Sequence, residues 1–330
     1  MIPPPQDPYR RRIDYLRLSV TDRCNLRCTY CMPREGVQKL PHEDILRYEE
    51  ILRLVRIVTA MGISKIRITG GEPLVRKDLL YLCESIARFS GLKSLSITTN
   101  GVLLPKFAKD LFGAGIKRIN VSLDTLRPEK YAAITQMDCF HQVWDGILKA
   151  HEIGFRPIKL NAVVMRGIND DEIEDLGRLT FRYPFHVRFI EFMPFQAEAG
   201  DQRFLSADDI LSRLSRVAPL VAAPKDGDTN GPASHFRFRD ALGKIGIISP
   251  VSHHFCPTCN RLRVTADGGL RTCLFSTSEV DLRTPLRGGA SEERIMEIIR
   301  RAIVEKPEKH SLESAVFRKC ISRPMFSIGG

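Results

Sequence analysis

Three cysteines stand close together near the start of the chain, at Cys24, Cys28 and Cys31. Their CxxxCxxC spacing places three thiols in one tight loop, and cysteine sulfur is the ligand that iron–sulfur centres prefer. Three thiolates leave one iron of a four-iron cluster open, so that iron could bind a small chelating molecule and pass an electron to it. Structural zinc sites usually take four ligands in CxxC pairs. An active-site cluster is therefore favoured, with zinc or three free buried thiols as alternatives.

A second set of three cysteines lies in the last third of the chain, at Cys256, Cys259 and Cys273. A short predicted hairpin separates the CxxC pair from the third cysteine. His253 and His254 lie nearby and could complete a zinc site, so zinc is a serious alternative here. We favour a second iron–sulfur cluster with an open iron, which could bind a nitrogen or oxygen of a substrate directly.

Several cations fall in predicted strands, where unpaired charges are rare. Arg261 and Arg263 follow Cys259 at alternate positions, so their guanidinium groups should share one face of a strand. Two arginines beside a metal site indicate phosphate or base recognition through bidentate hydrogen bonds. Arg17, Arg67 and Lys159 are further candidates for an anionic ligand. The alternatives are a solvated strand face and pairing with structural carboxylates.

The elements that would position these residues alternate between strand and helix. The sequence predicts strands at 15–20, 65–69, 94–98, 118–122, 158–164 and 187–191, each followed by at least one helix except the last. Such alternation indicates an α/β fold with a parallel sheet, and six units predict an incomplete (β/α)6 barrel related to the TIM barrel. A doubly wound open sheet is the alternative. In either fold the carboxyl ends of the strands, which carry the Cys24 loop and Gly70-Gly71-Glu72-Pro73, gather at one rim.

The chain after residue 222 has a different pattern. Residues 222–234 are rich in Pro, Gly, Asp and Asn and predict a linker or surface loop. Short strands are predicted at 235–238, 244–248, 261–265 and 270–273, with one helix at 291–304. We expect a barrel domain at 1–222 and a small α+β domain at 223–330 that covers the open side of the barrel.

Composition limits the location and the ligands. The 330-residue chain is 43% hydrophobic and carries a net charge of +11, dispersed along the sequence. Dispersed charge favours a small phosphate ligand over nucleic acid or a membrane, although an ordinary basic surface stays open. The proline-rich start lacks an apolar signal core and no apolar run approaches a membrane span, so the cytoplasm is expected. Cys83, Cys139 and Cys320 stand alone and are expected to be inert buried thiols.

The motifs together resemble a known family. Cys24, Cys28 and Cys31 on the first βα loop, with Gly70-Gly71-Glu72-Pro73 on the second, resemble the radical S-adenosylmethionine (SAM) superfamily. Further segments resemble its GTP 3′,8-cyclase family over nearly the whole chain: Leu18 to Asn25, Cys256 to Arg263, Thr265 to Gly268 and the closing Gly329-Gly330. The proline-rich start and the loop at 225–231 depart from that pattern.

The resemblance implies an enzyme of molybdenum cofactor biosynthesis with two four-iron, four-sulfur (4Fe–4S) clusters. SAM on the first cluster would be cleaved to a 5′-deoxyadenosyl radical that takes hydrogen from the ribose C3′ of GTP. The product would be (8S)-3′,8-cyclo-7,8-dihydroguanosine 5′-triphosphate, which cyclic pyranopterin monophosphate synthase would then rearrange. The second cluster would bind the guanine. An electron donor is required, and the chain is expected to be a monomer or a homodimer.

The resemblance also implies roles for individual residues. Contacts to SAM are implied for Tyr30, Gly71, Ser122 and Met193. Contacts to GTP are implied for Arg17, Arg67, Thr98, Lys159, Arg261, Leu262 and Arg263, with Thr99 as the alternative to Thr98. The Gly-Gly tail is implied to reach into the active site, although a terminal Gly-Gly is usually only a frayed end.

Two other functions stay open. A radical SAM enzyme acting on a peptide would have a second site with more cysteines and no need for several strand cations. A zinc protein that binds nucleic acid would be colourless and hold zinc at both cysteine sets.

Overall fold

A computed structural model describes residues 3–32, 36–193, 202–224, 231–276, 278–310, 323 and 325–329. Within them a twelve-stranded sheet runs in the order β12-β11-β10-β1-β2-β3-β4-β5-β6-β9-β8-β7. Pairing is parallel from β10 through β9 and antiparallel at both edges. The strands are β1 (Tyr15–Ser19), β2 (Lys65–Thr69), β3 (Ser94–Thr99), β4 (Arg118–Ser122), β5 (Ile158–Val164), β6 (His186–Glu191), β7 (Leu220–Ala222), β8 (Ser234–Phe238), β9 (Lys244–Ile248), β10 (Arg261–Val264), β11 (Gly269–Arg271) and β12 (Val280–Asp281).

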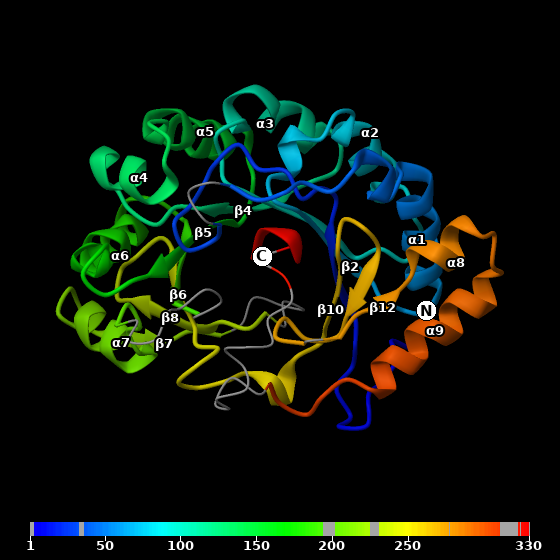
Figure 1. The fold of residues 1–330 in the computed structure, drawn as a ribbon. Helices are drawn as coiled ribbons and strands as arrows, with labels where there is room; N and C mark the ends of the chain where they lie inside the picture. Colours follow the sequence, from blue (N-terminus) through cyan, green and yellow to red (C-terminus); the bar gives the residue numbers. More distant parts are fainter. Residues whose placement is uncertain are drawn as a thin grey trace.

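The helices lie on the outer side of the curved sheet, and the C-terminal segment lies within the curve (Figure 1). A sheet covered in this way is an α/β architecture, as expected, and the doubly wound alternative, which needs helices on both faces, does not describe it. The helices are α1 (Tyr48–Ala60), α2 (Leu79–Ala87), α3 (Leu104–Gly113), α4 (Pro128–Thr135), α5 (Phe140–Ile153), α6 (Ile173–Arg182), α7 (Ala207–Ser215), α8 (Arg283–Arg287) and α9 (Glu292–Val304).

The hydrophobic pattern explains which face of the sheet meets the helices. In β2, Ile66 and Ile68 are buried in the core, whereas Arg67 between them points to the opposite face. Helix α1 buries the apolar stripe that contains Ile51, Leu54, Val55 and Val58. Apolar side chains thus fill the layer between sheet and helices, and polar side chains of the same strands line the inside of the curve.

The predicted βα units are present, with ends within about two residues of the predictions. Four elements were not predicted, namely α7, β7, α8 and β12. The strands after residue 222 join the same sheet, because β10 pairs with β1 and β9 pairs with β6. Part of the predicted linker, residues 225–230, lies outside the described residues. In the described part of the chain, no helix is both long enough and apolar enough to cross a bilayer.

Candidate active site

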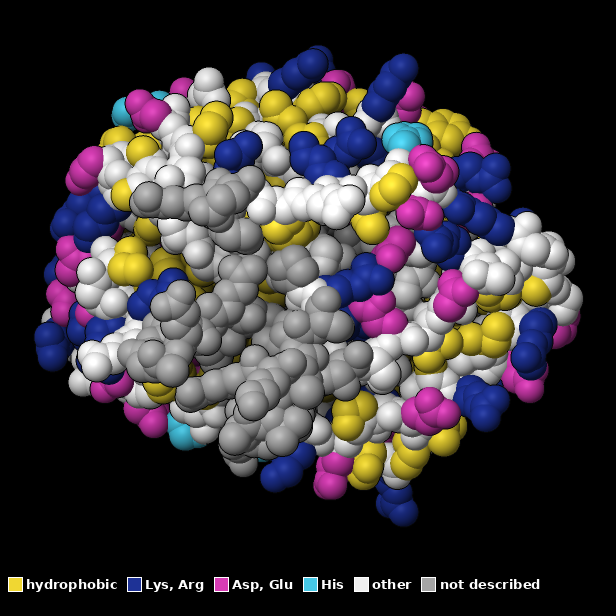
Figure 2. Space-filling view, in the orientation of Figure 1, with side chains coloured by type: hydrophobic (Ala, Val, Ile, Leu, Met, Phe, Trp, Pro, Cys, Tyr) yellow, Lys and Arg dark blue, Asp and Glu magenta, His cyan; other side chains and the backbone are white. Residues whose placement is uncertain are grey.

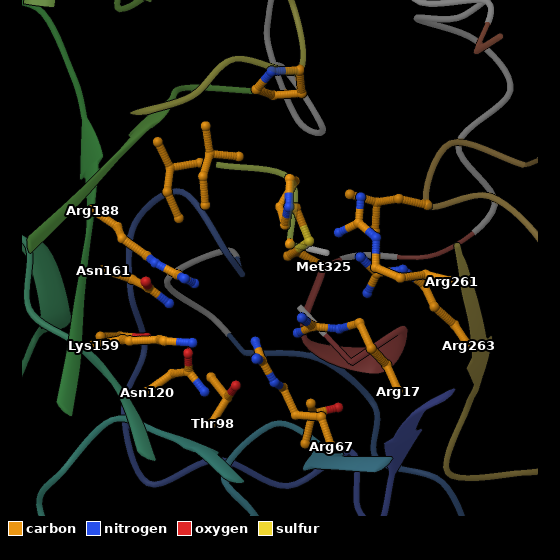
Figure 3. Close-up of a pocket in the computed structure, with 18 of the residues that line it drawn as sticks. Arg17, Arg67, Thr98, Asn120, Lys159, Asn161, Arg188, Arg261, Arg263 and Met325 are labelled. Carbon is orange, nitrogen blue, oxygen red and sulfur yellow. The ribbon is translucent and has the colours of Figure 1, made fainter. Parts of the chain in front are cut away.

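The inside of the curved sheet holds a cavity of about 740 Å³, which is large enough for a cofactor or nucleotide. All six clustered cysteines line it: Cys24, Cys28, Cys31, Cys256, Cys259 and Cys273. Figure 3 shows charged and polar side chains from several strands converging on this space. In Figure 2 apolar, basic and acidic side chains border the central part of this face, where many residues are drawn in grey. The two cysteine sets, far apart in sequence, therefore face one cavity.

The first sulfur trio, defined as Cys24, Cys28 and Cys31, lies on the loop after β1. The amide of Asn100 donates to the sulfur of Cys24 at 3.7 Å, and the backbone N–H of Cys31 donates to the carbonyl of Cys28 at 2.9 Å. Burial raises the pKa of Cys28 and raises that of Cys31 to about 12. These thiols become thiolates only when a cation compensates their charge, which is what a bound metal does.

The second sulfur trio, defined as Cys256, Cys259 and Cys273, comes from two separate turns. Cys256 begins a 3-10 turn (Cys256–Thr258), and Cys273 follows β11, which pairs antiparallel with β10. Burial by itself would raise the pKa of Cys259, but the charges of Arg261 and Lys306 outweigh it and lower that pKa to about 6. These two cations therefore favour the thiolate form of Cys259.

Both trios fit iron–sulfur clusters better than single zinc ions. Among the described residues, no three His, Cys, Asp or Glu side chains are grouped so as to hold one metal ion. In a cluster each thiolate binds a different iron atom, so the sulfurs need not converge on one point. His253, the first candidate fourth zinc ligand, contacts Asp208 at 2.9 Å instead, and neither it nor His254 lines the cavity. The all-thiolate donor sets are those that soft iron–sulfur centres take.

A row of arginines crosses three neighbouring strands at one level. Arg17 of β1 stands opposite Arg67 of β2 on one side and Arg263 of β10 on the other. All three line the cavity (Figure 3). Burial, together with the neighbouring arginines, lowers the pKa of Arg17 well below its usual value, and burial and Arg261 lower that of Arg263 to about 9. Like charges this close are costly to keep together, so the row offers guanidinium donors that an anion such as phosphate or carboxylate could accept from.

Other predicted contacts reach the same cavity. Lys159 and Arg261 line it, as do Tyr30, Gly71, Ser122 and Met193. Thr98 and Thr99 both line it, but the hydroxyl of Thr99 donates to Glu72 at 2.8 Å, whereas that of Thr98 is buried with no partner. The geometry therefore favours Thr98 as a ligand contact. The side chain of Leu262 lies in the hydrophobic core on the other face of β10, so only its backbone could meet a ligand.

The C-terminal segment enters the cavity. The carbonyl of Gly329 accepts hydrogen bonds from Arg17 at 3.2 Å and from Arg263 at 2.8 Å. Arg323 forms a two-bond ion pair with Asp267 beside the β10–β11 hairpin, at 2.9 and 2.8 Å. The expectation that the tail reaches the site therefore holds for Gly329, and Gly330 lies outside the described residues. A neutral carbonyl satisfies the arginine donors without removing their charge.

Gly71 is needed because the two loops at the rim touch there. Its N–H donates to the carbonyl of Thr21 at 2.8 Å. A Cβ on Gly71 would lie 2.4 Å from the carbonyl oxygen of Arg23, in the residue before Cys24. Only glycine permits this approach. The Gly-Gly turn therefore supports the backbone of the first sulfur trio.

Sequence reasoning missed several residues of the cavity wall. Asn120, Asn161 and Arg188 point into the cavity from β4, β5 and β6 (Figure 3). Asp124 accepts from the hydroxyl of Tyr30 at 2.8 Å, and burial raises its pKa to about 6. Arg188 sits in a predicted strand, the signal that identified Arg67. Asn120 and Asn161 lie in the middle of their strands, and the sequence gave no signal that singled them out.

Comparison with known proteins agrees with this site. The model of the Radical SAM superfamily matches residues 18–180, and that of Molybdenum Cofactor Synthesis C matches residues 185–312. Among solved structures, Streptococcus suis SuiB bound to S-adenosylmethionine resembles the chain with a TM-score of 0.59 at 16% identity, covering 91% of this chain and 73% of that chain. That likeness shows a shared fold.

The curated relatives define the family more closely. A GTP 3′,8-cyclase of Moorella thermoacetica is 49% identical over 326 residues, which cover 98% of this chain and all of the relative. The enzyme of the same name from Geobacter sulfurreducens is 49% identical, with coverage of 98% and 99%. The chain belongs to the GTP 3′,8-cyclase family.

Proposed function

We propose that the chain converts GTP into (8S)-3′,8-cyclo-7,8-dihydroguanosine 5′-triphosphate, with SAM as cosubstrate, as the first step of molybdenum cofactor biosynthesis. Family membership supports the reaction. The observation in this chain that supports the reaction is the shared cavity, in which two sulfur trios flank a row of arginines. When bound, two 4Fe–4S clusters and SAM supply the one-electron chemistry.

The protein's own contribution is to bind, orient and exclude water. Arg17, Arg67 and Arg263 form the arginine row, and we assign the triphosphate to it, with Lys159 and Arg261 as further cations that line the same cavity. Thr98 offers a buried hydroxyl beside Lys159 and Asn120. The first trio and its neighbours Tyr30, Gly71, Ser122 and Met193 would hold SAM. No side chain is assigned as an acid or base.

The triphosphate and the tail must share the arginine row. Two of its members donate to the carbonyl of Gly329 in the structure. A triphosphate offers charged oxygens, which make hydrogen bonds roughly twice as strong as neutral acceptors do. We infer that GTP displaces or rearranges this contact when it binds.

Family membership also supports proposals about the domains, the location and the partners of the chain. Residues 1–222 would form an incomplete (β/α)6 barrel, and residues 223–330 a smaller α+β domain that closes its open side. The described cysteines are free thiols, which suits the reducing cytoplasm. A one-electron donor would feed the clusters, and cyclic pyranopterin monophosphate synthase would consume the product. The chain would act as a monomer or a homodimer.

The described cavity favours this function over the two alternatives. A peptide substrate gives no reason for a row of three arginines of which two are buried, and the described residues offer no group of ligands for a single zinc ion. The test is anaerobic incubation of the purified protein with GTP, SAM and dithionite, followed by mass spectrometry. We expect 5′-deoxyadenosine and the cyclised nucleotide in equal amounts. Turnover of SAM that is indifferent to GTP would refute the proposal.

A further inference from the structure

Lys306 is a buried lysine that lies just beyond the end of α9 and next to the second sulfur trio. Lys306 is only 3% exposed to solvent. The ammonium group donates to the carbonyl of Arg261 at 3.2 Å, to the carbonyl of Thr272, and to the sulfur of Cys259 at 3.7 Å. An ammonium group has three N–H donors, so these contacts use all of them.

These contacts join the two turns that carry the trio. Thr272 directly precedes Cys273, and Arg261 follows Cys259 by two residues. The β10–β11 ladder pairs Arg263 with Arg271 and stops there, short of both cysteines. The segments that hold Cys259 and Cys273 therefore lie beyond the sheet pairing, and the ammonium group bridges them.

The charge of Lys306 also needs an explanation. Burying an ammonium group is costly unless an anion compensates it. The cations Arg11 and Arg261 lie close enough to oppose its charge, whereas the nearby groups that favour it are the sulfurs of Cys259 and Cys273. Arg261 also reaches the sulfur of Cys259, at 3.9 Å. The sulfurs of the second trio are thus the groups beside Lys306 that can compensate its charge, in opposition to burial.

We propose that Lys306 is a positioning residue of the second sulfur trio, which fixes the spacing of Cys259 and Cys273 and holds a positive charge against a cluster-bound sulfur. The inference rests on the proposed function, because it needs a cluster at that trio. Charge and hydrogen bonds at the sulfurs set the reduction potential of a cluster. A cation there stabilises the reduced, more negative state and raises the potential.

The test compares Lys306→Met, Lys306→Gln and the control Lys309→Met in the anaerobically purified full chain. Lys309 is an exposed lysine three residues away. Each protein is titrated with dithionite while the two clusters are followed by electron paramagnetic resonance. In both Lys306 variants we expect the potential of the second cluster to fall and that of the first to stay unchanged. Lys306→Met, which has no donors, should also lose iron from the second trio faster under a chelator. Lys309→Met should match the unmodified chain.

Selective loss of iron from the second trio in Lys306→Met would also support the inference, provided that the first cluster and the far-ultraviolet circular dichroism stay unchanged. Unchanged potential and iron retention in both Lys306 variants would overturn it. General unfolding, with loss of both clusters in both variants, would overturn it too, because Lys306 would then be only a stabilising residue. An unmodified chain without a second cluster would instead refute the proposed function.

Discussion

Replacing Gly71 by alanine tests whether the turn after β2 supports the first sulfur trio. The added Cβ would lie 2.4 Å from the carbonyl oxygen of Arg23, whereas ordinary contacts begin near 3.4 Å, so the two loops must separate by about 1 Å. The obstacle is backbone, with Cys24 next in sequence, and it has no flexible side chain to yield. Overpacking of this kind costs about 1–3 kcal/mol, and a shift of about 1 Å at an active site can cost on the order of 100-fold in rate.

The assay compares Gly71→Ala with Gly113→Ala after anaerobic purification. Gly113 ends α3 and has nothing within 4 Å of an added Cβ, so its variant should be as active as the unmodified chain. For Gly71→Ala we expect a lower melting temperature, weaker SAM binding by calorimetry and at least about 100-fold slower formation of 5′-deoxyadenosine. Normal SAM affinity and turnover in a folded Gly71→Ala protein would show that the close approach has no role.

Three further predictions concern the cavity wall. Arg17→Gln removes the central member of the arginine row. It should raise the KM for GTP by about 10- to 100-fold, which is the effect of losing a hydrogen bond to a charged group, and leave the affinity for SAM unchanged. Equal effects on both ligands would contradict the assignment. Asp124→Asn removes a carboxyl whose pKa burial raises to about 6. A carboxyl with a raised pKa stabilises the fold at low pH, and this stability is lost as the pH rises through 6. Between pH 4 and 7, the melting temperature of the unmodified chain should therefore fall relative to that of the variant. Parallel curves of melting temperature against pH would refute this. Gly329 has a φ of +73°, and the Cβ of Gly329→Ala would lie 2.5 Å from the hydroxyl of Thr69. The tail should therefore leave the arginines and become more sensitive to limited proteolysis. An unchanged cleavage pattern would contradict this prediction.

The sequence predicted the parts of the site that depend on local pattern. Alternating apolar residues gave the strands, and the carboxyl ends of parallel strands meet at one rim, so Arg17, Arg67 and Lys159 could be placed together. The cysteine spacing gave both sulfur trios. The contact of Leu262 with GTP was implied by the resemblance, and because the two-residue period of β10 turns its side chain to the core, such a contact would involve its backbone.

Contacts between distant segments could not be predicted. Lys306 follows an ordinary amphipathic helix in the sequence, and its role depends on how α9 packs beside β11. The hydrogen bond from Tyr30 to Asp124 joins loops that follow two different strands. The strands after residue 222 gave no signal that they would extend the main sheet at both edges, because pairing partners are set by tertiary packing.

The most direct test of the account uses two triple variants, one with Cys24, Cys28 and Cys31 changed to alanine and the other with Cys256, Cys259 and Cys273 changed. Each keeps a single trio, and iron analysis should give about four atoms per chain, against about eight in the unmodified protein. Paramagnetic resonance of the reduced proteins should then show that GTP changes the signal only where the second trio remains, and that SAM changes it only where the first trio remains. Zinc in place of iron, or GTP acting on the first trio alone, would contradict the central claim that the two trios divide one cavity between the two ligands.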